Sequence, residues 1–225
     1  MKKLAVFVHF GCHKTATTSI QKFCFDNRLL LEQNDIAYAP SSDSSGRHVE
    51  LNQCVLRRDV AMFTHPNILA VQNQLIANYQ ISVRELIETS KCRNFLFSDE
   101  GLDFIRTKTE LDRLKLLFPA QCEIVPVITL REKNEWKMSW IESLKKVNNN
   151  LDLEKFTNPL SPYWLNGNSW FFDVDHLVLL LRENFKRVVL IKYQNNMVAR
   201  FLSEFNIQVD REYELNKTFA LEQEK

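Results

Sequence analysis

Short apolar runs alternate along the chain with longer stretches in which apolar residues recur every three or four positions. The first pattern is typical of buried strands and the second of helices with one buried face. Strand patterns cover residues 4–10, 36–39, 94–98, 122–130 and 187–193, and helix patterns follow residue 16 and cover 49–60, 68–88, 109–118, 134–146 and 173–185. This alternation predicts an α/β fold in which helices flank a parallel sheet. Ligands of such folds bind at the carboxyl ends of the strands.

The first strand pattern is followed by Gly11, Lys14 and a group of hydroxyl residues, and then by a helix pattern. The free N–H groups at a helix start point outward, and the helix dipole favours negative charge there. Lys14 adds a full positive charge, and hydroxyls can donate hydrogen bonds to phosphate-like oxygens. The sequence therefore predicts an anion site, with a strand–loop–helix unit that binds nothing as the alternative. The hydroxyl residues are Thr15, Thr17, Thr18 and Ser19.

The spacing within this loop differs from that of two common phosphate loops. A nucleoside triphosphate loop needs a second glycine five residues after the first and then a lysine, but Ala16 and Thr17 stand at these positions. A phosphatase loop with Cys12 as the nucleophile would need an arginine at Thr18. The spacing therefore argues against both a nucleoside triphosphate loop and a phosphatase loop here.

The segment from Gly11 to Ser19 resembles the Gly-x-x-Lys-Thr-Gly-Thr-Thr-Ser signature of sulfotransferases that use 3′-phosphoadenosine 5′-phosphosulfate (PAPS). This resemblance implies a three-layer P-loop-like α/β fold, and Lys14 would act in catalysis. Ala16 stands where the family has glycine, and because alanine disfavours positive φ we expect ordinary helical angles there. Residues implied to bind the 5′-phosphosulfate are His13, Lys14, Thr15, Ala16, Thr17 and Thr18.

A second motif follows the strand pattern at 122–130, where Arg131 is followed eight residues later by Ser139. This pair resembles the sulfotransferase residues that bind the 3′-phosphate of PAPS. Arginine can bind phosphate through two hydrogen bonds, and serine can donate another. The alternative is a surface arginine before a capped helix.

Two residues are candidates for the base that accepts the acceptor's proton. Glu100 follows the strand pattern at 94–98 and resembles the glutamate base of carbohydrate sulfotransferases, although Ser98 or Asp99 could simply cap a helix there. Asp99 could instead hold magnesium in a kinase. The other candidate base is His48, in a serine-rich segment that could close over the acceptor, with an exposed loop histidine as the alternative.

Composition narrows the class of protein. The 225 residues carry a net charge of +1, which argues against a nucleic-acid partner. Five scattered cysteines indicate reduced thiols, and no apolar run is long enough to cross a membrane. We therefore expect a cytoplasmic enzyme of one domain, residues 1–225, with acceptor-binding segments at 40–60 and 148–172.

The expected reaction is transfer of a sulfonate group from PAPS to a hydroxyl or amine of a small molecule or glycan. It would release 3′,5′-ADP and need no metal. A P-loop kinase that uses ATP and magnesium, or an inactive nucleotide-binding module, is the alternative. The sequence leaves the oligomeric state open.

Overall fold

The computed structural model describes residues 4–12, 14–57, 72–147 and 172–209. They form a five-stranded sheet in the order β2-β3-β1-β4-β5, and all four strand pairs are parallel. The α/β class and the parallel sheet expected from the sequence are confirmed. The strands are β1 (Leu4–Gly11), β2 (Ile36–Tyr38), β3 (Asn94–Asp99), β4 (Cys122–Leu130) and β5 (Val189–Lys192).

Helices connect the strands, as the alternating pattern predicted. The helix expected over 49–60 ends at Val55, and residues 58–60 of it lie outside the described residues. The helices are α1 (Thr17–Asp26), α2 (Arg28–Gln33), α3 (Val49–Val55), α5 (Gln72–Thr89), the 3₁₀ helix η2 (Glu100–Phe104), α6 (Lys108–Leu116), α7 (Lys133–Val147), α9 (Val174–Asn184) and α10 (Met197–Ser203). None of them, within the described ranges, is both long and apolar enough to span a membrane.

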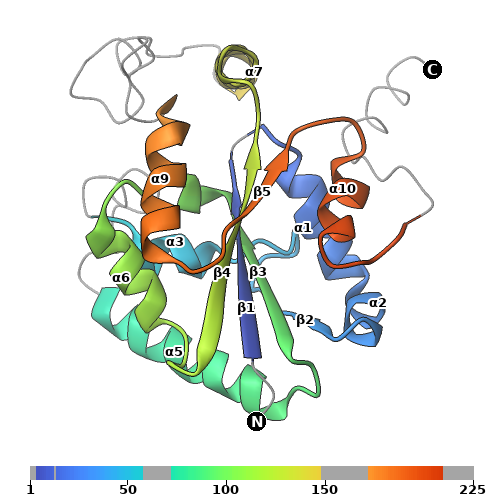
Figure 1. Cartoon of the computed structure of the whole chain (residues 1–225), viewed down its shortest axis with the longest axis vertical. Helices are drawn as coiled ribbons and strands as arrows, with labels where there is room; N and C mark the ends of the chain where they lie inside the picture. The colour runs from blue at the N-terminus through green and yellow to red at the C-terminus, as the bar shows by residue number, and fades with distance from the viewer. Residues whose placement is uncertain (1–3, 13, 58–71, 148–171, 210–225) are drawn as a thin grey trace.

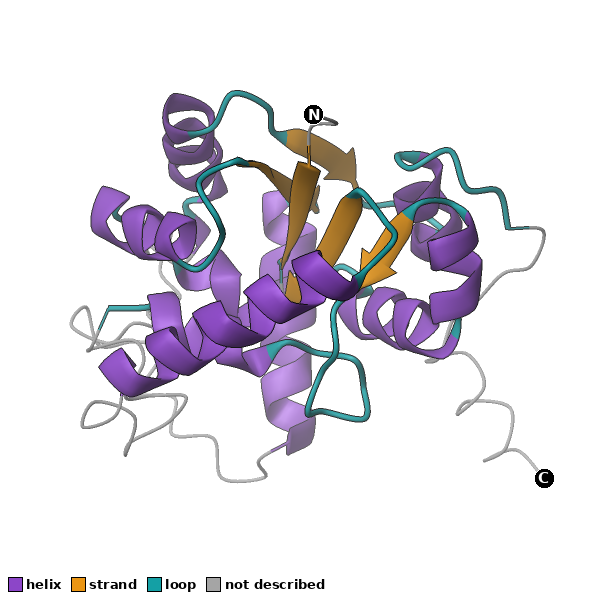
Figure 2. Ribbon diagram, turned by 90° about the horizontal axis from the view of Figure 1, so that it is seen from below, coloured by secondary structure: helices purple, strands orange, loops and turns teal. Residues whose placement is uncertain are grey.

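Two apolar cores lie on opposite faces of the sheet, each covered by one of the two groups of helices that Figure 1 shows beside it. Val6, Val8 and Phe10 of β1 join the core under α3, α5, α6 and α9, whereas Phe7 packs into the core under α1, α2 and α10. This is the alternation that a strand buried on both faces produces. The molecule is therefore three-layered, with helices on either side of the sheet (Figure 2).

The register of the central strands determines where a site can form. Phe10 of β1 pairs with Asp99 of β3, and Gly11 pairs with Thr129 of β4. The segments that follow these three strands therefore begin side by side at the carboxyl edge of the sheet. From this edge α1 packs on one face and α9 on the other, while α7 lies beyond the strand ends (Figure 1). Adjacent strands whose connections leave toward opposite faces create the crevice that ligands of α/β proteins occupy.

All five cysteines are free, in agreement with the reduced thiols expected. Cys12 lies in the loop after β1 and is almost completely shielded from solvent. Burial raises the pKa of its thiol well above the ordinary value, so the thiol stays protonated. This agrees with the exclusion of a phosphatase nucleophile at this position.

Candidate functional site

The loop between β1 and α1 turns sharply because two of its residues are left-handed. Lys14 has a φ of 64° and Ala16 a φ of 63°. Ala16 is the residue that precedes α1, and its left-handed conformation redirects the chain from the strand into the helix. The expectation of ordinary helical angles at Ala16 was wrong, because the closure of the turn outweighs the preference of alanine.

Gly11 is required for the same turn. A Cβ atom on Gly11 would lie 2.2 Å from Cγ2 of Thr17, so only glycine allows β1 and the start of α1 to approach this closely. The hydroxyls of Thr15 and Thr17 both donate to the carbonyl oxygen of Cys12, and the Thr15 hydroxyl also contacts that of Thr129 at 2.7 Å. These buried hydroxyls hold the loop together, so Thr15 and Thr17 could reach an anion only through their backbone N–H groups.

The remaining features of the loop are open to solvent and positive. Lys14 and Thr18 are exposed, and the first turn of α1 contains no acidic residue. Ala16 supplies no side-chain cap, so the outward N–H groups of this ten-residue helix are not satisfied by a cap. A lysine beside an uncapped helix start favours an anionic ligand. His13 lies outside the described residues.

Arg131 follows β4 and reaches the same loop. Its Nη1 atom donates to the carbonyl oxygen of Lys14 at 3.2 Å, and its guanidinium lies 4.6 Å from the ring centre of Tyr193. Its Nε atom is shielded from solvent and makes no hydrogen bond within the described part of the chain. A buried donor without an acceptor is unfavourable, so an incoming ligand oxygen would find an unused donor here. The two sequence motifs are therefore joined in space.

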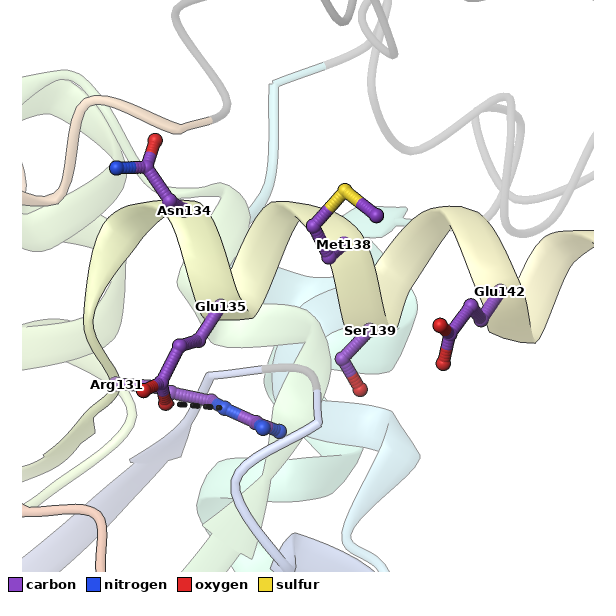
Figure 3. A pocket seen from close by; sticks show the side chains of 6 residues that line it. All are labelled: Arg131, Asn134, Glu135, Met138, Ser139 and Glu142. Carbon is purple, nitrogen blue, oxygen red and sulfur yellow. Dashed lines mark ion pairs between the residues drawn. The ribbon is translucent and has the colours of Figure 1, made fainter.

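An open pocket of about 450 Å³ lies beside this arginine and along α7. Ser139, half-buried, points from α7 to the same side as Arg131 (Figure 3). The volume falls within the range of small-molecule sites. The pocket thus brings together the two residues of the second motif, and its lining residues are Arg131, Asn134, Glu135, Met138, Ser139 and Glu142.

The two acidic residues at the end of β3 have different environments. Asp99 is completely buried and accepts hydrogen bonds from Arg47 Nε at 2.8 Å, from the Gly101 N–H at 3.1 Å and from the Asn52 N–H at 3.2 Å. Burial raises the pKa of Asp99, and Arg47 acts in the opposite direction. Asp99 also caps η2, which confirms the capping interpretation and leaves its carboxylate closed to a magnesium ion in this conformation.

Glu100, the next residue, is half-buried and its carboxylate can reach solvent. Its Oε1 atom lies 3.7 Å from Nη1 of Arg47. Arg47 therefore contacts both acids, and its own pKa is raised because their charges outweigh the effect of burial. The sequence does not mark this arginine as a site residue, because its acidic partners stand more than fifty residues away and no local pattern connects them.

The structure contradicts an exposed, mobile position for His48. The side chain is buried, and its Nδ1 atom accepts a hydrogen bond from the Ser98 N–H at 3.0 Å. Nε2 must then carry the proton, which it donates to the carbonyl oxygen of Ala39 at 2.9 Å. Burial lowers the pKa of His48. With both nitrogens engaged, this residue has no atom free to accept a proton from an acceptor.

The expected acceptor segments are only partly described. Residues 40–57 form the loop and helix that close over the end of β3, whereas 58–60 and 148–171 lie outside the described residues. Phe172, the last residue of the second segment, is buried against Trp136 of α7 at a ring-centre distance of 5.0 Å. This contact belongs to the core.

A comparison of the sequence with protein-family models and with curated proteins gives no match. What defines the site is therefore its geometry: a three-layer α/β fold with an uncapped helix start, an exposed lysine and an arginine with an unused donor at one crevice.

Proposed function

We propose that the chain is a sulfotransferase with a P-loop-like fold that moves a sulfonate group from PAPS to a hydroxyl or amine acceptor. One observation carries the proposal: the hydrogen bond from Arg131 to the Lys14 carbonyl unites the two motifs that resemble the PAPS site. These motifs stand 117 residues apart in the sequence. Their meeting at one crevice is what binding of a single two-ended ligand requires.

Each end of PAPS would have its own partners. The 5′-phosphosulfate would bind the outward N–H groups from Thr15 to Thr18, next to the Lys14 ammonium and with His13 in the same loop. The 3′-phosphate would enter the pocket beside α7, where Arg131 Nε offers an unused donor and Ser139 a hydroxyl. Charge-assisted hydrogen bonds of this kind are the strong ones.

In the proposed reaction the acceptor oxygen or nitrogen attacks sulfur, the bond from sulfur to the bridging phosphate oxygen breaks, and 3′,5′-ADP leaves. The Lys14 ammonium would stabilise the charge that develops on that oxygen. Glu100 would take the proton from the acceptor, because its side chain reaches solvent at the end of β3, whereas the neighbouring Asp99 is enclosed. No step of this reaction calls for a metal ion.

Nucleotide binding tests the first half of the proposal. We expect 3′,5′-ADP to raise the melting temperature far more than 5′-AMP or ATP with magnesium, since ligands stabilise the state they bind. Arg131→Ala should remove most of the preference for the 3′-phosphate, because loss of a charge-assisted contact costs about 1.5–3 kcal/mol. Equal shifts with 3′,5′-ADP and 5′-AMP would contradict the assignment of Arg131 and Ser139.

Transfer from labelled PAPS to a panel of glycans, phenols and amines tests the second half. Lys14→Ala should reduce kcat much more than it weakens 3′,5′-ADP binding, because the charge of Lys14 matters most as the bond breaks. Glu100→Gln should reduce turnover about 10²–10⁴-fold with little change in melting temperature. A magnesium-dependent shift with ATP alone would favour the kinase, and 3′,5′-ADP binding without any transfer would favour a non-catalytic module.

A further inference from the structure

The arginine proposed to receive the 3′-phosphate already has an acidic neighbour. Glu135 stands four residues after Arg131, and its Oε2 atom lies 3.5 Å from Arg131 Nε. The two side chains point toward each other, and both line the pocket (Figure 3). At this distance the contact is an ion pair without a hydrogen bond, which agrees with the unused donor on Nε. A phosphate oxygen that bonds to Nε would therefore compete with this carboxylate.

Arg131 is the more firmly held member of this pair. Its guanidinium is bonded to the Lys14 carbonyl and lies against Tyr193, and its side chain is 21% exposed. The side chain of Glu135 is 62% exposed, and its backbone N–H is bonded to Glu132. The helix start is thus fixed while the Glu135 carboxylate can swing into solvent, so Glu135 is the group that would give way.

We propose that Glu135 is a specificity-determining residue that competes with the 3′-phosphate for Arg131. This inference rests on the proposed function. A nucleotide with a 3′-phosphate must displace the carboxylate and approach it with like charge. A nucleotide with a free 3′-hydroxyl leaves the ion pair in place and can donate its hydroxyl to the same carboxylate. Glu135 therefore lowers the affinity for 3′-phosphorylated nucleotides relative to nucleotides with a free 3′-hydroxyl. Because it weakens the binding of 3′,5′-ADP, it also helps this nucleotide to dissociate.

A merely structural role of Glu135 makes the opposite prediction. If the carboxylate served to orient Arg131 for the phosphate, its removal would weaken binding of 3′,5′-ADP. The sign of the change therefore separates competition from orientation. The same pocket supplies a matched control, since Glu142 lies one turn beyond Ser139 on the same side of α7 (Figure 3). Among the described residues, the ion pair of Arg131 is with Glu135 and not with Glu142.

The experiment is isothermal titration of 3′,5′-ADP and 5′-AMP into the full chain and into Glu135→Gln, Glu135→Asp and Glu142→Gln. We expect Glu135→Gln to tighten 3′,5′-ADP about three- to fivefold, the upper part of the range for a solvent-exposed ion pair, without tightening 5′-AMP. Glu135→Asp keeps the charge but is too short to hold the contact, so it should give a smaller gain. Glu142→Gln removes the same charge from the same pocket but breaks no ion pair with Arg131, so it should tighten 3′,5′-ADP less than Glu135→Gln does, and the difference between the two variants measures the competition for Arg131.

Unchanged or weaker 3′,5′-ADP binding by Glu135→Gln would overturn the inference, as would an equal gain in Glu142→Gln, which would indicate a general field effect. Both outcomes leave the proposed function standing if the wild type still prefers 3′,5′-ADP to 5′-AMP. If the wild type and all variants bind neither nucleotide, the proposed function fails and this inference fails with it. Melting temperatures of the variants, expected to match the wild type, exclude unfolding as the cause.

Discussion

The left-handed conformation of Ala16 leads to a prediction that can be measured without any ligand. At a φ of 63° an alanine is less stable than a glycine by about 1–2 kcal/mol, so Ala16→Gly should relieve this strain. Two losses oppose the gain. The half-buried methyl group packs against the core under α1, where its removal costs less than about 0.8 kcal/mol, and glycine gains about 0.5–1 kcal/mol of freedom in the unfolded chain.

Ala77 provides the matched control. It is exposed within α5, where alanine is the favoured residue, so Ala77→Gly should lower the free energy of unfolding by about 1 kcal/mol. The entropy of the unfolded chain is common to both variants and cancels in the comparison. Two terms remain for Ala16→Gly: the relief of backbone strain, which stabilises the folded state, and the loss of the methyl contact, which destabilises it. Their difference makes the free energy of unfolding of Ala16→Gly about 1 kcal/mol higher than that of Ala77→Gly.

For a chain of this size, 1 kcal/mol corresponds to about 2–4 °C in melting temperature. We therefore expect Ala16→Gly to melt close to or above the wild type and Ala77→Gly to melt about 2–4 °C below it. Calorimetry and urea unfolding of the three proteins measure the difference. Equal destabilisation by the two substitutions would refute the left-handed turn, and with it the account of how β1 is redirected into α1.

Two further predictions concern the same edge of the sheet. Gly11→Ala should lower the free energy of unfolding by about 1–3 kcal/mol in urea, because the new methyl group would overlap Thr17; the double variant with Thr17→Ala should recover part of the loss. The second concerns His9, whose pKa is lowered to about 3 by burial. Because the folded state resists protonation, the stability that His9 contributes is present above pH 6.5 and is lost as the pH falls toward 3, by up to about 5 kcal/mol. In His9→Gln the free energy of unfolding should therefore fall less steeply as the pH is lowered from 6.5 toward 3. An unchanged pH dependence would show that other groups govern acid unfolding.

The sequence predicted the strands and the α/β class because each buried strand and each covering helix has a recognisable pattern of apolar residues within its own segment. A strand covered on both faces, such as β1 or β4, is nearly continuously apolar, and in the covering helices apolar residues recur every three or four positions. The order of the strands in the sheet is not encoded in such a local pattern. That β1 lies between β3 and β4 depends on which edges pair in three dimensions, and no residue pattern in the chain specifies it.

The candidate site was predictable where its residues belong to one turn, and unpredictable where they depend on distant contacts. Lys14 and Arg131 follow their strands directly, so their motifs placed them at the correct edge. The burial of His48 was not foreseen, because it depends on Ser98 and Ala39, the first of them fifty residues away. The neighbour Glu135 could have been found, since a spacing of four residues from Arg131 allows an ion pair on one helical face.

The different roles of Asp99 and Glu100 follow from the geometry of a strand end. Asp99 is the last residue of β3, so its side chain still points into the layer between the sheet and α3, where it is enclosed by backbone N–H groups and by Arg47. Glu100 begins η2, where the chain leaves the sheet and its side chain turns toward solvent. Arg47 is held by the 2.8 Å bond from its Nε atom to Asp99, and this places its Nη1 atom 3.7 Å from Oε1 of Glu100. The buried carboxylate thus sets the position of the arginine, and the arginine limits where the accessible carboxylate can lie, so Asp99 can influence chemistry at this edge without touching a substrate.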